Sequence, residues 1–182
     1  GDGVVAAGVG LVISQPGTLN VQVPAGATVK QVLLYVSGYH DNINPAATMT
    51  FKVNSQDVTA ERIGGPVLFA LPNYCPASYR ADITSLNLVA AGANALTIGE
   101  VDFEIQTFGA GVVVVFDLPD ADAVDIFVRD GMDAAYHEFA APLNATAEQV
   151  YTFPASDEAR TATLWLLVGS AKDNGLRPNL TT

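Results

Sequence analysis

The chain has 182 residues and a mass of 19.0 kDa, and its 19 acidic and 8 basic residues give a net charge of −11. This length is typical of one folded domain, and a content of 49% hydrophobic against 15% charged residues excludes a disordered chain. The acidic balance excludes nucleic acid as a partner, because phosphates are bound by clustered Lys and Arg side chains. Such a surface suits cations or a saline exterior.

The first apolar stretch covers residues 4–14 and has the sequence VVAAGVGLVIS. It carries no charge and no polar residue before Ser14, which predicts a strand that is buried on both faces. The strand is either the first of its own domain or a strand donated to a neighbouring copy. We therefore divide the chain into residues 1–14, a candidate donor strand, and residues 15–182, a single β-sandwich domain. The predicted contacts between subunits are Val4, Val5, Val9, Leu11, Val12 and Ile13.

Short stretches of alternating apolar and polar residues, bounded by turn residues, follow in the first half of the chain. This pattern is typical of β-strands, and we expect residues 33–36 to lie in a central one. The predicted strands are residues 18–23, 29–39, 49–53 and 58–63. Residues 54–57 (NSQD) predict a hairpin turn. Three prolines within residues 64–78 predict a long irregular connection.

Residues 79–98, YRADITSLNLVAAGANALTI, predict a chain crossing, a turn and a strand in succession. The side chains of Asp82 and Thr84 can bond to nearby backbone N–H groups, which favours a turn or a short helical crossing. Gly92 and Asn94 tolerate positive φ and suit a tight turn, after which the apolar alternation of a strand begins. A unit of this kind joins the two sheets of a sandwich.

The second half contains residues 112–116 (VVVVF), the best candidate for a buried central strand. Further strand candidates are residues 124–128, 134–141, 150–153 and 161–168. In the last of these we expect Leu164 and Leu166 to face the core. Because no stretch keeps a 3.6-residue apolar period, we expect little helix and roughly ten to twelve strands. The predicted fold class is all-β, a jelly-roll-like antiparallel β-sandwich.

The order VLLYVSGY, FKVNSQDV and YRADITSLNLVAAGANALTI resembles the galactose-binding-like domains. In that family a "LY" strand, an x-V-N-G-like hairpin, a [DN]-[IV]-T crossing and a G-x-N-x-L turn occur in the same order. The resemblance covers residues 32–98 and implies a jelly-roll scaffold, since these motifs belong to the scaffold. The second half, from GAGVVVVFDLPD through IFVRDGMD to RTATLWLLVG, loosely resembles secreted surface and filament-forming β-sandwiches of bacteria and archaea.

Acidic residues are densest between positions 117 and 133. Ca²⁺ takes about six to eight oxygen ligands from flexible loops, and two groups of closely spaced carboxylates here each provide part of such a shell. The candidate ligands are Asp117, Asp120 and Asp122, with Asp130 and Asp133 as alternatives. A second loop offers Asp41, Asn42 and Asn44. A solvated acidic rim, in which Asp residues form turns, explains the same pattern, so both interpretations stay open.

The residues suited to catalysis lie in no known catalytic motif. His40 and His137 are the only histidines, and no Gly-x-Ser-x-Gly, His-Glu-x-x-His or Cys/His pair frames them. Cys75 is the only cysteine, which excludes an internal disulfide and leaves a packed thiol or a cross-link between chains. We therefore expect no enzymatic activity.

Other sequence features bear on location. No apolar run reaches the ~20 residues of a membrane helix, and the triplets at Asn144 and Asn179 match the glycosylation sequon. We expect an extracellular or cell-surface protein from which a signal peptide has been removed. The expected function is a non-enzymatic subunit that assembles with copies of itself, by strand donation, into a surface filament, tube or layer. The alternative is a jelly-roll module that binds carbohydrate, such as surface glycans, or another surface ligand.

Overall fold

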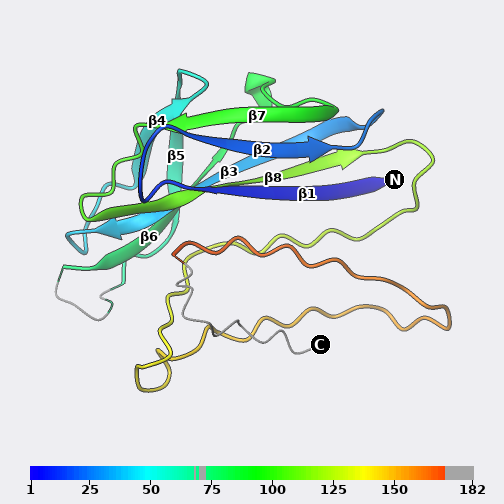
Figure 1. Cartoon of the computed structure of the whole chain (residues 1–182). Helices are drawn as coiled ribbons and strands as arrows, with labels where there is room; N and C mark the ends of the chain where they lie inside the picture. The colour runs from blue at the N-terminus through cyan, green and yellow to red at the C-terminus, as the bar shows by residue number, and fades with distance from the viewer. Residues whose placement is uncertain (68, 70–72, 171–182) are drawn as a thin grey trace.

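Eight antiparallel strands form one sheet that curves into a nearly closed barrel (Figure 1). The computed structural model describes residues 1–67, 69 and 73–170. The strands are β1 (Asp2–Gly10), β2 (Gly17–Val23), β3 (Thr28–His40), β4 (Thr48–Val53), β5 (Gln56–Gly64), β6 (Cys75–Asp82), β7 (Gly92–Gly99) and β8 (Gln106–Asp117). Among the described residues, the only helical segment is the 3-10 turn η1 (Thr84–Leu86). The predicted all-β fold with little helix is confirmed.

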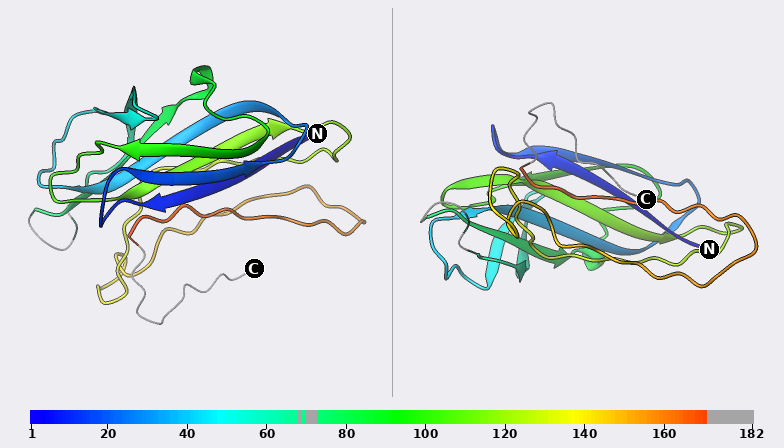
Figure 2. Two further views of the ribbon diagram at one scale, coloured as in Figure 1. Left: turned by 45° about the horizontal axis from the view of Figure 1, so that its top comes forward. Right: turned by 90° about the horizontal axis from the view of Figure 1, so that it is seen from below.

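The strand order is β1-β8-β3-β6-β5-β4-β7-β2. A sandwich predicts two separate sheets, whereas here β5 is paired with β6, with Glu61 opposite Arg80 and Arg62 opposite Tyr79. This pairing makes the sheet continuous. The two ends of the order, β1 and β2, lie side by side in Figure 1 and in both views of Figure 2. The barrel is closed except along the line between β1 and β2, which we call the seam.

The inward side chains of β3 and β8 form the middle of the core. Leu34 and Val36 of β3 and Val112 and Val114 of β8 are almost completely buried. Both strands are central, because β3 is paired with β6 and β8, and β8 with β1 and β3. The sequence-based placement of both strands is confirmed.

A bulge near the end of β3 brings the strand against the loop that follows β7. The register between β3 and β8 shifts between Ser37 and Gly38, and such shifts bend a strand. Only glycine fits at position 38, since a Cβ there would lie 2.4 Å from both the Gln106 carbonyl oxygen and the Phe103 ring. This close approach places His40 against the same loop.

The predicted crossing and turn after β6 are present. The Asp82 carboxylate accepts hydrogen bonds from the Thr84 N–H at 3.0 Å and from the Thr84 hydroxyl at 2.5 Å. The Asn94 side chain accepts from the Ala90 N–H at 2.9 Å and donates to the Ala90 carbonyl at 2.8 Å, and Gly92 has a φ of 98°. Local side-chain hydrogen bonds and one glycine therefore form this unit.

The hairpin between β4 and β5 turns at two residues, Asn54 and Ser55, with φ of 47° and 66°. Two successive positive φ angles are what a two-residue hairpin turn of the right twist requires. The turn is also bonded to β7, because the Thr97 N–H donates to the Asn54 side chain at 2.8 Å. The predicted hairpin is confirmed, with a shorter turn than expected.

Residues 118–170, which we call the arm, run in extended form below the barrel in Figure 1. The described part of the arm contains no strand or helix. The described residues as a whole therefore contain eight strands instead of the expected ten to twelve. Four strand predictions are therefore wrong, at residues 124–128, 134–141, 150–153 and 161–168. Alternation decides which side chains share a face, but a strand also needs a neighbouring chain to pair its N–H and C=O groups.

The expectation that Leu164 and Leu166 face the core is also wrong, since they are 57% and 58% exposed. Their neighbour Leu167 lies over β8 instead, where a Cβ added to Gly111 would come within 3.0 Å of Leu167 Cδ1. Leu167, which has the opposite parity to Leu164 and Leu166, is the side chain that contacts the barrel. This contact also explains why β8 is apolar on both faces, because the arm covers its outer side.

Candidate assembly surface

In the part of the chain that the structure describes, β1 is hydrogen-bonded to a neighbouring strand along one edge. Its nine residues pair with β8, from Asp2 opposite Asp117 to Gly10 opposite Gly109. Its other edge faces β2 across the seam, and β2 is hydrogen-bonded to β7 in the strand order. A strand that is bonded along one edge is the part of a sheet most open to exchange or extension.

Both faces of β1 carry apolar side chains, and one of them faces the core. The predicted burial of both faces is wrong, because the residues of β1 are half-buried at most. Val5, Ala7 and Val9 pack against the core cluster. Val4 and Ala6 lie on the opposite face and are half-buried. In the isolated chain β1 is therefore the first strand of its own barrel, one of the two alternatives that the sequence leaves open.

The connection from β1 to β2 is exposed between two anchored points. Leu11 is buried, and its N–H donates to a carbonyl of β8 at 2.9 Å. Val12 and Ile13 are 52% and 97% exposed. Gln15 fixes the far end, because its side chain donates to the Val101 carbonyl at 2.8 Å and accepts from the Val101 N–H at 2.9 Å. The intervening residues form a short exposed linker.

Asp130 anchors the arm on the outer face of the barrel. Its Oδ2 accepts hydrogen bonds from Arg80 Nη1 at 2.8 Å and from the Tyr35 hydroxyl at 2.9 Å. Burial raises the pKa of Tyr35 well above its ordinary value, and the hydrogen bond to Asp130 is the second cause. Further along, the backbone of Met132 lies against Gly64, where a Cβ would be 2.2 Å from the Met132 nitrogen. The arm is thus held against β3, β5 and β6.

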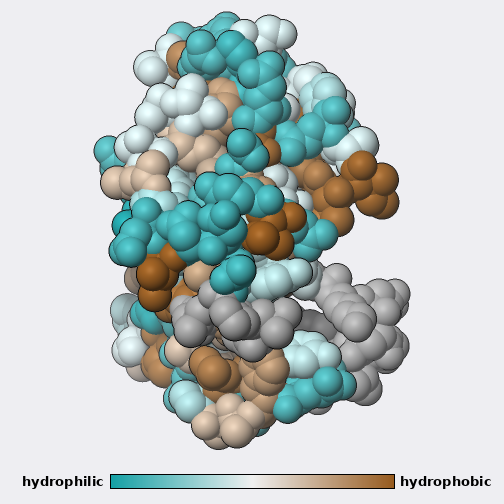
Figure 3. Space-filling view, turned by 90° about the vertical axis from the view of Figure 1, so that its left-hand side faces the viewer, coloured by the Kyte–Doolittle hydropathy of each residue, from teal (hydrophilic) through white to brown (hydrophobic). Residues whose placement is uncertain are grey.

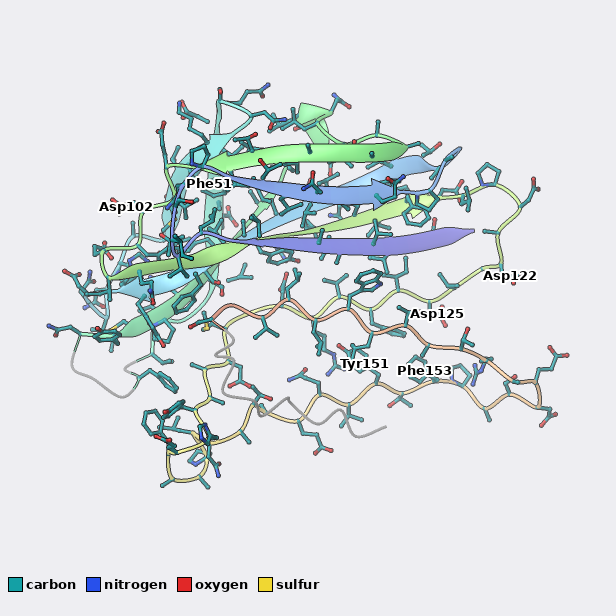
Figure 4. The ribbon with its side chains drawn as sticks, viewed as in Figure 1. Phe51, Asp102, Asp122, Asp125, Tyr151 and Phe153 are labelled. Atoms are coloured by element: carbon teal, nitrogen blue, oxygen red, sulfur yellow. The ribbon has the colours of Figure 1, made fainter. Side chains whose placement is uncertain are left out.

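An aromatic cluster links two segments of the arm. The Arg129 guanidinium donates to the Val150 carbonyl at 2.6 Å and lies 4.4 Å from the centre of the Tyr151 ring. The Phe127 ring packs edge-on against Tyr151 and Phe153, with centroids 6.0 and 5.8 Å apart. Figure 4 shows Tyr151 and Phe153 in the space between the extended segments of the arm that run below the barrel. Side chains, rather than a main-chain ladder, connect these segments.

The arm exposes a large set of apolar side chains. Exposed apolar groups of this size mark interaction surfaces when they lie together. On the end of the molecule shown in Figure 3, by contrast, hydrophobic side chains stand in separate groups among hydrophilic ones. The exposed apolar residues of the arm are Val124, Phe127, Val128, Leu143, Val150, Phe153, Leu164, Trp165, Leu166, Leu167 and Val168.

The predicted calcium ligands between positions 117 and 133 are spread out. Asp130 is held by the ion pair described above, and Asp133 accepts from the Ala147 N–H at 2.5 Å. Asp117 lies 3.7 Å from the terminal ammonium of Gly1. In the described part of the chain, no three His, Cys, Asp or Glu side chains gather closely enough to hold a metal. Calcium binding stays a prediction. The two remaining candidates, both exposed, are Asp120 and Asp122.

The second candidate loop is organised by its own side chains. The Asn42 amide donates to Asp41 Oδ1 at 2.9 Å, and Asn42 Oδ1 accepts from the Asn44 N–H at 2.9 Å. These are the local bonds by which Asx residues form turns. The geometry therefore gives these residues a structural explanation without an ion.

The other residues singled out in the sequence lie apart from one another. Cys75 is a buried free thiol, in line with the packed-thiol interpretation. His137 is exposed and lies 3.6 Å from Glu138. Asn144 is exposed on the arm, and Asn179 lies outside the described residues. No helix in the described ranges is long and apolar enough to span a bilayer.

The sequence analysis missed a buried polar network at the end of β3. The Tyr79 hydroxyl donates to the Ala46 carbonyl at 3.0 Å and lies 2.9 Å from His40 Nε2. The other ring nitrogen of His40 contacts the Glu104 carboxylate, so both nitrogens of the buried ring have partners. The strand alternation contained the signal, because His40 has the same parity as the inward residues Leu34 and Val36.

A groove of about 480 Å³ lies on the outer face of β3, β5 and β6, beside the arm. Across it, Gln31 Nε2 donates to Asp82 Oδ2 at 3.0 Å. This hydrogen bond is the main cause that lowers the pKa of Asp82, and the hydrogen bond from Thr84 is the second. The polar residues that line the groove are Gln31, Thr59, Glu61, Arg80, Asp82 and Asp130, and its apolar walls are Leu33, Ala81 and Val128.

A known protein family matches most of the chain. The family model described as "Protein of unknown function (DUF3344)" matches residues 7–179. The chain belongs to the DUF3344 family. The match covers most of the barrel and the whole arm, so both belong to one family unit and the arm is no separate appendage. No curated protein and no solved structure matches the chain.

Proposed function

We propose that this chain is a non-enzymatic structural subunit of an extracellular surface assembly, and that copies are joined by exchange of β1. The main support is the position of β1, which is hydrogen-bonded along one edge and lies at the open seam of the barrel. An exposed linker connects it to β2. An exchanged β1 would form the same nine-residue ladder with β8 of a neighbour. The exposed sequon at Asn144 supports an extracellular location.

The fold on which this proposal rests is a jelly roll. The strand order supports it, because it divides into β1-β8-β3-β6 and β5-β4-β7-β2. Every pair of sequence neighbours except β4 and β5 is split between these two groups of four. Eight antiparallel strands arranged in this way are typical of the jelly roll. The resemblance of residues 32–98 to galactose-binding-like domains points to the same scaffold.

A cysteine pair across β1 and β8 tests strand exchange. Val4 lies opposite Val115 in the ladder, so Val4→Cys with Val115→Cys, in a Cys75→Ser background, places two thiols across the pair. Oxidation of the monomer should link each chain to itself. Oxidation of assembled protein should link chains into a ladder of multimers on a non-reducing gel.

The control is Val4→Cys alone in the same background, which has no partner thiol in the ladder. Negative-stain imaging before oxidation establishes whether filaments, tubes or layers are present. Assemblies in which every disulfide stays within one chain would overturn strand exchange. A protein that forms no assembly at any concentration would overturn the whole proposal.

A second candidate is a module that binds carbohydrate, and the polar groove favours it. Carboxylate, amide, hydroxyl and guanidinium groups line this groove of about 480 Å³, and such groups pair with sugar hydroxyls. Binding to a glycan array by the monomer, abolished by Gln31→Ala and retained by Gln22→Ala on β2, would support it. An array without binding would reject it.

A further inference from the structure

Residues 161–168 of the arm, TATLWLLV, form an uncharged apolar segment in a chain of net charge −11. Two sets of side chains alternate along it. Leu167 rests on β8 over Gly111, while Leu164, Leu166 and Val168 are 57%, 58% and 68% exposed. The segment therefore has an inner side on its own barrel and an outer apolar stripe that faces solvent.

The main chain of this segment has no strand partner in the part of the chain that the structure describes. Among the described residues, no backbone-to-backbone hydrogen bond involves positions 161–168. An extended main chain flanked by apolar side chains is satisfied most fully by another strand, which supplies N–H and C=O groups at the right spacing. A small molecule that covered only the side chains would leave these groups unpaired.

We propose that residues 161–168 form a β-strand that pairs with the same residues of a second copy about a two-fold axis. The charge distribution favours a second copy as the occupant. Two chains of charge −11 repel each other over most of their surfaces, and this uncharged segment is a place where they can meet. A basic partner would gain no ion pair there.

Two-fold symmetry also sets the register of the pair. The same surface is used by both copies, so the inner stripes of both strands lie on one side and the outer stripes on the other. An antiparallel register centred on Trp165 meets this condition, with Leu164 of each copy opposite Leu166 of the other. This contact is separate from β1 and does not depend on strand exchange.

Trp165 reports on this contact directly, because it is the only tryptophan of the chain and is 47% exposed. As the concentration of the full chain is raised, its emission should shift to the blue while light scattering reports a dimer. Leu164→Glu together with Leu166→Glu should weaken the dimer at least about tenfold, since like-charged Glu side chains would then stand directly opposite each other at both cross-strand positions. The matched control is Ile43→Glu, which alters a loop residue that is 55% exposed and should leave the dimer unchanged.

A complementary pair of variants tests the register. Leu164→Glu alone and Leu166→Lys alone should each weaken self-association, and an equimolar mixture should recover it because Glu and Lys then face each other across the axis. Circular dichroism melts of each variant verify that the barrel is folded. Wild-type protein that stays monomeric, or a double Glu variant that dimerises like the wild type, would overturn the proposal. A wild-type dimer that forms without any change in Trp165 emission would place the association at another surface, such as β1, and would also overturn the proposal.

Discussion

The Tyr79 hydroxyl joins the buried ring of His40 to the carbonyl of Ala46, an exposed residue. Tyr79→Phe should lower the free energy of unfolding by about 1–3 kcal/mol, because the Ala46 carbonyl and His40 Nε2 lose a partner. Tyr39→Phe is the matched control, with an expected change of about 0–0.5 kcal/mol, since the Tyr39 hydroxyl makes no hydrogen bond to the described residues. Urea unfolding measures both, and equal losses would contradict the importance of the network.

Asp82 predicts a dependence of stability on pH. Its pKa is lowered in the folded chain from the ordinary 3.8, first by the bond from Gln31 and then by Thr84. A carboxyl group with a depressed folded-state pKa stabilises the fold above its unfolded pKa, and this contribution is lost as the pH falls through the folded pKa. Asp82→Asn should therefore be less stable than the wild type at neutral pH, by about 1 kcal/mol or less for so exposed a group.

The difference between Asp82→Asn and the wild type should shrink as the pH is lowered below 3.8. Thermal melts at a series of pH values measure it, with Asp102→Asn, at an exposed position of the loop after β7, as the control. A penalty that stays constant from neutral to acid pH would show that the charge of Asp82 is not what stabilises the crossing.

At the scale of the element, β8 separates the core from the face beneath the arm. Val114 is completely buried in the barrel, and Val115 is half-buried on the outer face. Val114→Ala should cost about 2 kcal/mol of stability, and Val115→Ala about 0.5–1 kcal/mol, in proportion to the apolar area each removes from water. Chemical unfolding compares them. A larger cost at Val115 would mean that the arm is packed as tightly as the core.

At the scale of the whole molecule, the charge of −11 predicts how self-association responds to salt. Raising the ionic strength from about 0.01 M to about 0.15 M shortens the Debye length from about 30 Å to about 8 Å, which screens the repulsion between like-charged chains. Association should therefore become tighter with added NaCl. Sedimentation measures the dissociation constant, and Ile43→Glu, which adds one negative charge, should show a slightly steeper dependence. Weakening by salt would indicate contacts between opposite charges, against both proposed interfaces.

The sequence by itself determined the features that depend on near neighbours along the chain. The apolar run of residues 112–116, the turn at Asn54 and Ser55, and the crossing at Asp82 and Thr84 were all predicted, because alternation, positive φ and local side-chain hydrogen bonds are properties of a few consecutive residues. The class of fold follows from the sum of such elements.

Only the tertiary structure decided which segments obtain a partner strand. Residues 164–168 form an apolar run like that of the central strand β8, yet they are unpaired among the described residues, and Leu164 faces solvent. His40 lies just outside the predicted strand of residues 29–39, yet it is the buried last residue of β3 and lies beside Tyr79. Main-chain pairing and burial depend on contacts between residues far apart in the chain, and a local pattern contains no information about which of those contacts form.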